Sequence, residues 1–525
     1  MGHREVERVA SEARWRKPPR SLDSPYAEPA LGYIALVNRR LLTDDDLALR
    51  PSGGNRNPWL REALADEGNP PPNPPLTGST DAEVVIVGGG YTGMWTAYRL
   101  LELDPQRRVM LVDMDVCGGG PSGRNGGFVN GWWDELALLR DLFGGEQALA
   151  CAREVARSVT EIGAWCERHG IHADFRHRGM LTVSTTPLHD GSWDSSIDAA
   201  RHLGVGDAFR GLSSEEVAEH CRSPLFRGGA LMADAGTVQP ARLARGLRAV
   251  CAARGAVIHE GTRVRRLRRE GSTVRVITES AEGDGEVRAG QVVLAINAWA
   301  AGWRPFRRSL VTWSSWMVRT EPIPDLIDER LGWTGGESIV DARFTVHYFH
   351  VAADGRIAFG AGGGRPGYDG RIGRWFVDDL AAGRRAAAGF RHIFPQLADV
   401  RLSDMWGGPI DVAADHLPRF GTLAGGRVHF GLGYSGNGVA PSHLGGRILA
   451  ALALGSVEPI TRLPIVGEVP SRFPPEPFRY AGARILREAL IRREDGEEEG
   501  RRAGWVLREL TRLPRRLGYR LGPES

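Results

Sequence analysis

Lysine is almost missing from this sequence. Lys17 is the only lysine among 67 basic residues in a chain of 525 residues. A Schiff-base or other catalytic lysine is therefore excluded from the rest of the chain. Long apolar runs are missing too, and no stretch of about 18 apolar residues predicts a membrane-spanning helix. The 64 acidic residues nearly balance the basic ones, and a net charge of +3 is too small to suggest nucleic-acid binding.

Cysteine is also scarce, with five residues in the whole chain. They form no CxxC pair and are too few for a disulfide framework. The first residues contain no apolar core of a secretory signal. We therefore expect a protein of the reducing cytoplasm. Glycine is abundant, with 69 residues, so we expect many positions where φ is positive or another group approaches the backbone closely.

Composition divides the chain into three parts. Residues 1–80 are rich in Pro, Gly and Asn, which predicts an irregular N-terminal arm with short helices at 32–42 and 59–64 and a Pro-rich linker. A globular body begins near residue 81. From about residue 478, apolar residues at helical spacing alternate with charged runs, which predicts surface helices with a solvated charged loop at 494–502.

The strongest motif is a glycine turn between a predicted strand and a predicted helix. The apolar run AEVVIVGG leads into the turn, and the helix covers residues 91–103. An acidic residue, Asp113, ends the next strand. Glycines at these spacings permit a sharp turn, close approach of a pyrophosphate and close packing of helix on strand. The motif therefore predicts a dinucleotide site formed by Gly88, Gly90, Tyr91, Thr92, Gly93 and Asp113.

Further elements follow along the body. Buried strands are predicted within 255–280 and 286–299, and alternating runs predict a hairpin at 344–364 around the Asp354-Gly355 turn. The sequence pattern of residues 427–454 again predicts a strand, a glycine turn and a helix. After the strand that ends at Asp113, the segment CGGGPSGRNGG at 117–127 combines flexibility with polar side chains, as expected of a loop that lies along an extended ligand.

These motifs together resemble those of the D-amino-acid-oxidase-like FAD-dependent oxidoreductases. The resemblance runs from about residue 81 to about residue 455 and is strongest to the branch that contains gamma-glutamylputrescine oxidase. The segments that carry it are the glycine turn, GPSGRNGG at 120–127, TVQP at 237–240, VVLAINAW at 292–299, DAR at 341–343, WGGPID at 406–411 and GLGYSGNG at 431–438.

The resemblance implies a mixed α/β fold, in which a Rossmann-like FAD-binding domain is interleaved with a substrate domain built on a mixed antiparallel sheet. The FAD-binding domain is expected at 81–140, 225–300 and 405–457. The substrate domain is expected at 141–224 and 301–404, and a tail with surface helices at 458–525. FAD is expected to be non-covalent, because relatives that attach it use a Cys in the C-terminal half and no Cys follows Cys251.

The resemblance also implies roles for individual residues. Ser122, Arg124, Asn125 and Gly126 are expected to flank the diphosphate and the flavin. Val264 is expected to contact the adenine through its backbone, and Asn297 and Ala298 to lie beside the diphosphate and ribose. The flavin pyrimidine edge is expected to meet the segment formed by Gly433, Tyr434, Ser435, Gly436, Asn437 and Gly438.

The substrate side is less constrained by motifs. The segment WGGPIDVAADHLP at 406–418 lacks the Arg that amino-acid oxidases of the family use for an α-carboxylate, so an amine without that group is expected. Candidate catalytic residues are Tyr348, His350, Arg343 and Trp406. His347 and an aromatic wall that includes Trp313 are further pocket candidates. Asp134 and Glu135 are interpreted as solvated helix charges.

The implied reaction is oxidation of a primary or secondary amine to an imine by hydride transfer to flavin N5, followed by hydrolysis. The acceptor that reoxidises the flavin is O₂ or an unidentified one. Since no lysine is available to promote reaction with O₂, oxidase and dehydrogenase both stay open. Alternatives are an amine or amino-acid dehydrogenase, and a flavin-binding interaction module without turnover. No metal is expected. The sequence leaves open the amine, the oligomeric state and the roles of residues 1–80 and of the tail.

Overall fold

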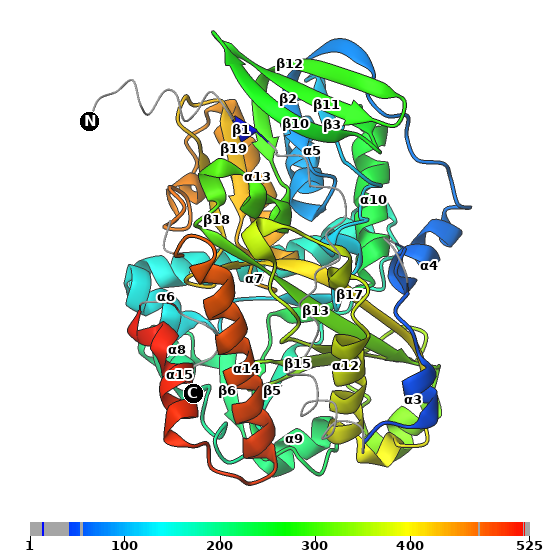
Figure 1. Cartoon of the computed structure of the whole chain (residues 1–525), viewed down its shortest axis with the longest axis vertical. Helices are drawn as coiled ribbons and strands as arrows, with labels where there is room; N and C mark the ends of the chain where they lie inside the picture. The colour runs from blue at the N-terminus through cyan, green and yellow to red at the C-terminus, as the bar shows by residue number, and fades with distance from the viewer. Residues whose placement is uncertain (1–12, 15–40, 53–55, 471–472, 518, 520–525) are drawn as a thin grey trace.

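The structure, a computed structural model, describes residues 13–14, 41–52, 56–470, 473–517 and 519. Its strands form two large sheets and one small one, which confirms the mixed α/β fold (Figure 1). The helix predicted at 32–42 lies almost wholly outside the described residues. The helix predicted at 59–64 is observed as α4, Pro58–Asp66.

The first sheet has a parallel core. β2 pairs in parallel with β12 on one side and with β3 on the other, β3 pairs in parallel with β9, and β12 with β19. Among the described strands, antiparallel ones extend the sheet only on the β12 side, where β11, β10 and β1 follow β12 and β18 pairs with β19, whereas the other edge is the parallel strand β9. The strands of this sheet are β1 (Ala13–Arg14), β2 (Gly78–Val87), β3 (Val109–Val112), β9 (Val257–His259), β10 (Arg263–Glu270), β11 (Thr273–Ser280), β12 (Gly283–Leu294), β18 (Arg419–Thr422) and β19 (Val428–Leu432).

The second sheet is antiparallel except for one parallel pair, β14 with β5. The predicted hairpin is present, since β15 and β16 pair antiparallel. The strands, in spatial order, are β17 (Leu402–Ala413), β13 (Leu310–Thr320), β16 (Ile357–Ala361), β15 (His347–Val351), β14 (Ser338–Asp341), β5 (Met180–Val183), β7 (Gly229–Met232) and β6 (Phe209–Leu212). A small sheet pairs β4 (Phe128–Asn130) with β8 (Ala235–Thr237).

Helices cover the sheets. They are α3 (Asp44–Ala48), α4, α5 (Tyr91–Leu103), α6 (Leu136–Phe143), α7 (Gly145–His169), α8 (Asp194–His202), α9 (Ser214–His220), α10 (Pro240–Ala253), α11 (Pro324–Leu326), α12 (Leu380–Ile393), α13 (Val439–Leu454), α14 (Phe478–Glu498) and α15 (Trp505–Arg516). Short 3-10 helices are Pro121–Gly123, Gly206–Ala208, Asn297–Gly302, Arg304–Phe306, Tyr368–Gly370, Arg374–Phe376, Pro395–Leu397 and Pro459–Arg462, and Ile327–Leu331 is a short π-helix. No helix in the described ranges is long and apolar enough to cross a membrane.

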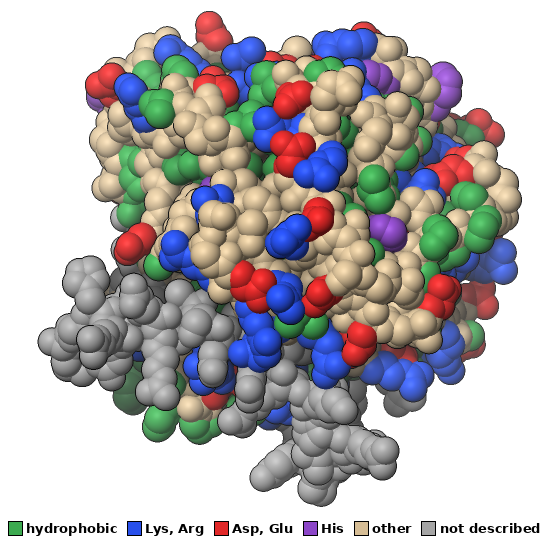
Figure 2. Space-filling model, turned by 90° about the horizontal axis from the view of Figure 1, so that it is seen from above, with side chains coloured by type: hydrophobic (Ala, Val, Ile, Leu, Met, Phe, Trp, Pro, Cys, Tyr) green, Lys and Arg blue, Asp and Glu red, His purple; other side chains and the backbone are tan. Residues whose placement is uncertain are grey.

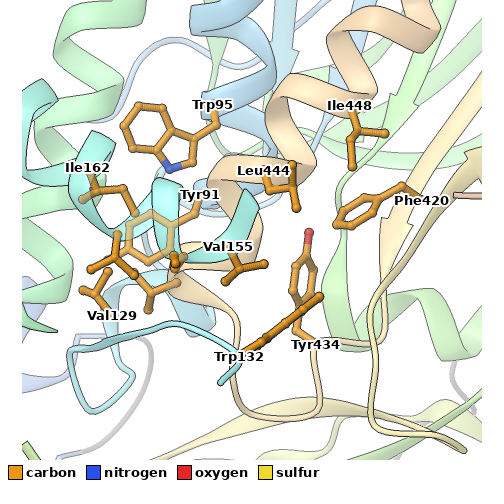
Figure 3. Packing of buried hydrophobic residues seen from close by; sticks show 14 of the residues in the cluster. Tyr91, Trp95, Val129, Trp132, Val155, Ile162, Phe420, Tyr434, Leu444 and Ile448 are labelled. Carbon is orange, nitrogen blue, oxygen red and sulfur yellow. The ribbon is translucent and has the colours of Figure 1, made fainter. Parts of the chain in front are cut away.

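The core follows from strand alternation. Val84 and Ile86 of β2 face a cluster that includes α5, α7, α10 and α13, while Val85 and Val87 face a second cluster on the opposite side of the sheet. Figure 3 shows side chains of α5, α7 and α13 meeting in the first cluster. A third cluster packs the second sheet against α12. The burial of both faces of β2 explains its continuous apolar sequence.

The predicted division into domains stays a proposal. The strand pairing bears on its boundaries, because β7 and most of β17 belong to the second sheet although both fall within segments predicted for the FAD-binding domain. On the molecular face seen in Figure 2, acidic and basic side chains are interspersed without a field of one sign.

One prediction for the tail is wrong. Residues 494–498 form the last turn of α14 rather than a solvated loop, and the side chain of Glu494 is buried. The reason is an ion pair with Arg343, a residue far away in the sequence.

Candidate active site

A single cavity of about 1220 Å³ connects the two glycine turns and extends to the second sheet. It is lined by residues 88 and 90–92 from the first turn and by residues 434–438 from the second. Other predicted cofactor residues that line it are Asp113, Ser122, Arg124, Asn125, Gly126, Val264 and Asn297, whereas Gly93, Ala298 and Gly433 do not. The fold thus brings together sequence segments that are more than 300 residues apart.

The first turn shows why two of its positions require glycine. Gly88 has φ +112°, and a Cβ there would lie 2.3 Å from the carbonyl oxygen of Ala295 on the neighbouring strand. A Cβ on Gly93 would lie 2.0 Å from the carbonyl oxygen of Gly88. Gly93 therefore allows α5 to pack directly against β2, the role that the spacing predicts, and this explains why it does not reach the cavity.

Asp113 stands at the end of β3 and holds the turn. Its carboxylate accepts hydrogen bonds from the backbone N–H of Gly89 at 2.6 Å and of Asp115 at 2.8 Å. Burial raises the pKa of Asp113 to about 6. Asp113 lines the cavity, as Val264 does, so the predicted contact with ribose hydroxyls is compatible with its position.

Arg124 links the loop at 117–127 to β17 of the second sheet. Its guanidinium donates to the carbonyl of Gly119 at 2.7 Å and to the carbonyl of Gly407, on β17, at 3.1 Å. Burial lowers the pKa of Arg124 to about 10, so the group is still charged at neutral pH. A buried guanidinium at the cavity wall favours an anionic ligand.

The second turn is held by Asp411, which is buried on β17. Its carboxylate accepts from the backbone N–H groups of Gly433 and Tyr434, and from the side-chain amide of Asn297 at 3.0 Å. Burial raises the pKa of Asp411 to about 7. This carboxylate therefore fixes the loop that precedes α13 relative to the strand end at Asn297.

Helix α13 begins directly after this loop, so its first backbone N–H groups lie at the end of the loop. The helix begins after Gly438, which makes no side-chain capping hydrogen bond. Gly436, Asn437 and Gly438 line the cavity. Uncapped N–H groups and the positive end of the helix dipole favour an anion or a hydrogen-bond acceptor there.

Three of the four predicted catalytic residues, Tyr348, Trp406 and Arg343, line the main cavity. The Tyr348 hydroxyl lies 2.8 Å from the Ser315 hydroxyl, and burial raises the pKa of Tyr348 to about 12. Trp406 is almost fully buried and its indole N–H donates to the Arg124 carbonyl at 2.9 Å. Trp313 also lines the cavity.

His350 and Arg343 differ in their surroundings from Tyr348 and Trp406. His350 lines a second, smaller cavity of about 290 Å³ and not the main one. The ring of Phe128 is edge-on to both Tyr348 and His350, at 5.7 and 5.9 Å. Arg343 reaches the main cavity, but its guanidinium pairs with Glu494, Asp495 and Glu498 of α14. The nearby His347 pairs with Asp341 at 2.7 Å.

Asp134 and Glu135 do not point into bulk solvent, contrary to the sequence interpretation. Both line the main cavity just before α6. Burial raises the pKa of Asp134 to about 6, and burial together with the charge of Asp134 raises the pKa of Glu135 to about 8. The sequence shows only their polarity, because the cavity that surrounds them is formed by distant segments.

Comparison with known proteins assigns the family. The family described as DAO, FAD dependent oxidoreductase, matches residues 83–452. The chain belongs to this family. Like the family as a whole, this oxidoreductase is FAD-dependent, and the resemblance seen in the sequence is confirmed.

Individual relatives agree with this assignment. The oxidoreductase is 30% identical to the probable oxidoreductase OrdL of Rhizobium meliloti over 405 residues, which covers 76% of this chain and 88% of that protein. It is 26% identical to gamma-glutamylputrescine oxidoreductase of Escherichia coli over 396 residues, with coverage of 73% and 86%.

Solved structures show the same fold. L-proline dehydrogenase from P. horikoshii is 20% identical with a TM-score of 0.59, and the match covers 74% of this chain and 97% of that chain. Glycine oxidase from Geobacillus kaustophilus is 22% identical with a TM-score of 0.56, and the match covers 73% and 96%.

The residues present fit an FAD molecule. Both glycine turns open onto one cavity, each leads into a helix whose N-cap glycine supplies no side-chain hydrogen bond, and Arg124 provides a buried cation beside β17. A Cβ on Gly90 would lie 2.9 Å from the Ser122 hydroxyl, so a side chain there would intrude on the wall of the cavity. The carbonyl oxygen of the Asn297 side chain is buried in the lining without a hydrogen-bond partner in the described part of the chain. It is an acceptor suited to a ligand hydroxyl.

Proposed function

We propose that this oxidoreductase oxidises a primary or secondary amine to an imine, which water then hydrolyses. The observation that carries the proposal is the continuity of one cavity from the two glycine turns to the half-buried Tyr348–Ser315 pair on the second sheet. When bound, FAD supplies an acceptor for the hydride of the amine C–H bond at its N5 atom. The names of relatives, including gamma-glutamylputrescine oxidoreductase and glycine oxidase, support an amine or amino acid as the substrate.

The protein residues provide position and electrostatics. At neutral pH the Tyr348 hydroxyl is protonated, because burial raises its pKa to about 12. The Tyr348–Ser315 pair can therefore exchange hydrogen bonds with a neutral amine nitrogen but does not serve as a base. Trp406 contributes a buried indole to the wall of this region. These features suit a reaction in which positioning makes the main contribution.

The proposed cofactor contacts follow from the same geometry. Residues 88–92 and Arg124 would hold the diphosphate, Asp113 the ribose, and residues 434–438 with the α13 N-terminus the flavin ring. A helix N-terminus beside the ring would stabilise negative charge that develops there. Non-covalent binding and residence in the cytoplasm stay predictions.

Anaerobic mixing of the purified, yellow holoprotein with a panel of primary and secondary amines tests the proposal. Loss of the flavin absorption band with at least one amine is the expected result. Release of peroxide when air is readmitted identifies an oxidase. Bleaching without rapid reoxidation by air identifies a dehydrogenase that uses another acceptor. A yellow protein that no amine bleaches contradicts the proposal and favours a binding module.

A further inference from the structure

Helix α14 forms part of the wall of the main cavity. Leu486, Arg487 and Leu490 line it together with the segment 343–346. In Figure 1 the helix runs in front of the second sheet, beside α15. The helix lies beyond the part of the chain, residues 83–452, that matches the family. The cavity wall is therefore completed by a segment that the family assignment does not cover.

Buried ion pairs fix α14 in this position. Arg343, which is 2% exposed, pairs with Glu494 and Glu498 on one face of the helix. Glu494 also accepts a hydrogen bond from the backbone N–H of Thr345 at 3.0 Å. Arg385 of α12 pairs with Asp495 at 3.4 Å. These contacts set the rotation of the helix and thereby the side chains that face the cavity.

With the helix in this orientation, Arg487 is the basic residue of α14 that lines the cavity. Its Nε donates to the carbonyls of Gly363 and Gly364 at 2.7 and 2.6 Å, which anchors the guanidinium. Its ion pair with Glu488 is long, 3.7 Å, and Glu488 also pairs with Arg492 at 3.1 Å. Among the described residues no carboxylate lies within hydrogen-bond distance of Arg487, in contrast to Arg343.

The charge of Arg487 persists at neutral pH. Burial and the neighbouring Arg385 lower its pKa to about 10, which is still well above 7. A partly desolvated guanidinium whose ion pair with Glu488 is long, 3.7 Å, gains from an anionic partner, and its planar N–H groups match a carboxylate. Leu486 and Leu490 would contact the apolar part of the same ligand.

We propose that Arg487 is a specificity-determining residue, which binds an acidic group on the amine substrate at the end of the cavity walled by α14. This inference rests on the proposed amine oxidation and adds the substrate class, an amine that carries a carboxylate. The contact would come from α14, which lies outside the part of the chain that matches the family.

The test compares two matched amines that differ only in the terminal group. Pentylamine ends in a methyl group and 5-aminopentanoate ends in a carboxylate. For the wild-type holoenzyme, we expect a KM for 5-aminopentanoate at least tenfold below that for pentylamine. In Arg487→Met the KM for 5-aminopentanoate should rise at least tenfold, while the KM for pentylamine changes less than twofold. Arg487→Lys should restore part of the preference.

Arg484→Met serves as the matched control, because Arg484 is exposed on the same helix and does not line the cavity. Flavin content and melting temperature confirm that each variant folds. Equal changes in KM for both amines in Arg487→Met, or no change in either, overturn the inference.

A binding measurement separates this inference from the proposed function. Pentanoate, which has no amine, is titrated into the holoprotein and its Kd is read from the flavin difference spectrum. A Kd that weakens at least tenfold in Arg487→Met but not in Arg484→Met supports the site even if no amine bleaches the flavin. If pentanoate does not bind, or binds both variants alike, and the amine pair shows no selective effect, the inference fails.

Discussion

The indole N–H of Trp406 donates a 2.9 Å hydrogen bond to the backbone carbonyl of Arg124, and the Arg124 guanidinium donates back to the carbonyl of Gly407. This reciprocal pair joins β17 to the loop that follows β3. The two walls of the cavity are therefore tied together at the position where flavin and substrate are proposed to meet.

Trp406→Phe should loosen this junction. The carbonyl of Arg124 loses its buried donor, which costs about 1–3 kcal/mol. We expect a lower free energy of unfolding and faster loss of FAD on dilution, measured by chemical denaturation and by flavin fluorescence. Trp505→Phe, at an exposed position on α15, is the control, and a Trp406 variant that retains FAD as tightly as this control contradicts the role.

Gly93→Ala should prevent formation of the first turn. Its Cβ would lie 2.0 Å from the carbonyl oxygen of Gly88, so α5 must move away from β2 at a cost of about 1–3 kcal/mol or more. The expected result is a protein purified with little flavin and with a lower melting temperature. Gly482→Ala is the control, because that position has open space within α14 and should gain about 1 kcal/mol in stability.

Asp411→Asn should change the pH dependence of stability. Burial raises the pKa of Asp411 to about 7 in the folded protein, against about 4 for an unfolded Asp. Between these values the folded state binds the proton and the unfolded state does not, so the wild type loses stability as pH rises from about 4 to about 7. Relative to Asp411→Asn, the free energy of unfolding should decline across that window in denaturant titrations. A constant difference between the two proteins from pH 4 to pH 8 would refute the assignment.

Arg343→Met distinguishes a structural from a catalytic role for this residue. Removing the arginine leaves the carboxylates of Glu494 and Glu498 without their cation, and loss of one partner of a buried pair costs about 3–5 kcal/mol. We expect a lower melting temperature and proteolytic cleavage in α14, while the flavin spectrum is retained. A variant that is as stable as the wild type but inactive toward amines would instead support the catalytic role that the sequence suggests.

Tyr348→Phe should slow amine oxidation without removing the flavin. The variant loses the hydroxyl that pairs with Ser315, and we expect kcat/KM to fall about tenfold, equivalent to about 1.4 kcal/mol. Since burial raises the pKa of Tyr348 to about 12, the wild-type rate should show no Tyr348 titration below pH 10. Tyr368→Phe, at an exposed position, is the control for a general loss of activity.

The sequence by itself determined the local elements and the cofactor class. The glycine turn, the helix at 91–103, the second turn before α13 and the β15–β16 hairpin depend on spacing and backbone conformation within about 30 residues, so local patterns were sufficient to predict them. The family and its FAD dependence follow from the same segments.

Only the tertiary structure decided what the long-range charges do. The sequence does not show that α14, about 150 residues away, supplies carboxylate partners for Arg343, nor that residues 494–498 of the loop predicted at 494–502 are helical. Asp134 and Glu135 look like surface charges until distant segments enclose them in the cavity. The sequence does not show whether a charged side chain is surrounded by water or paired with an opposite charge. Burial and pairing depend on segments far apart in the chain, and local sequence patterns do not predict which of these segments meet.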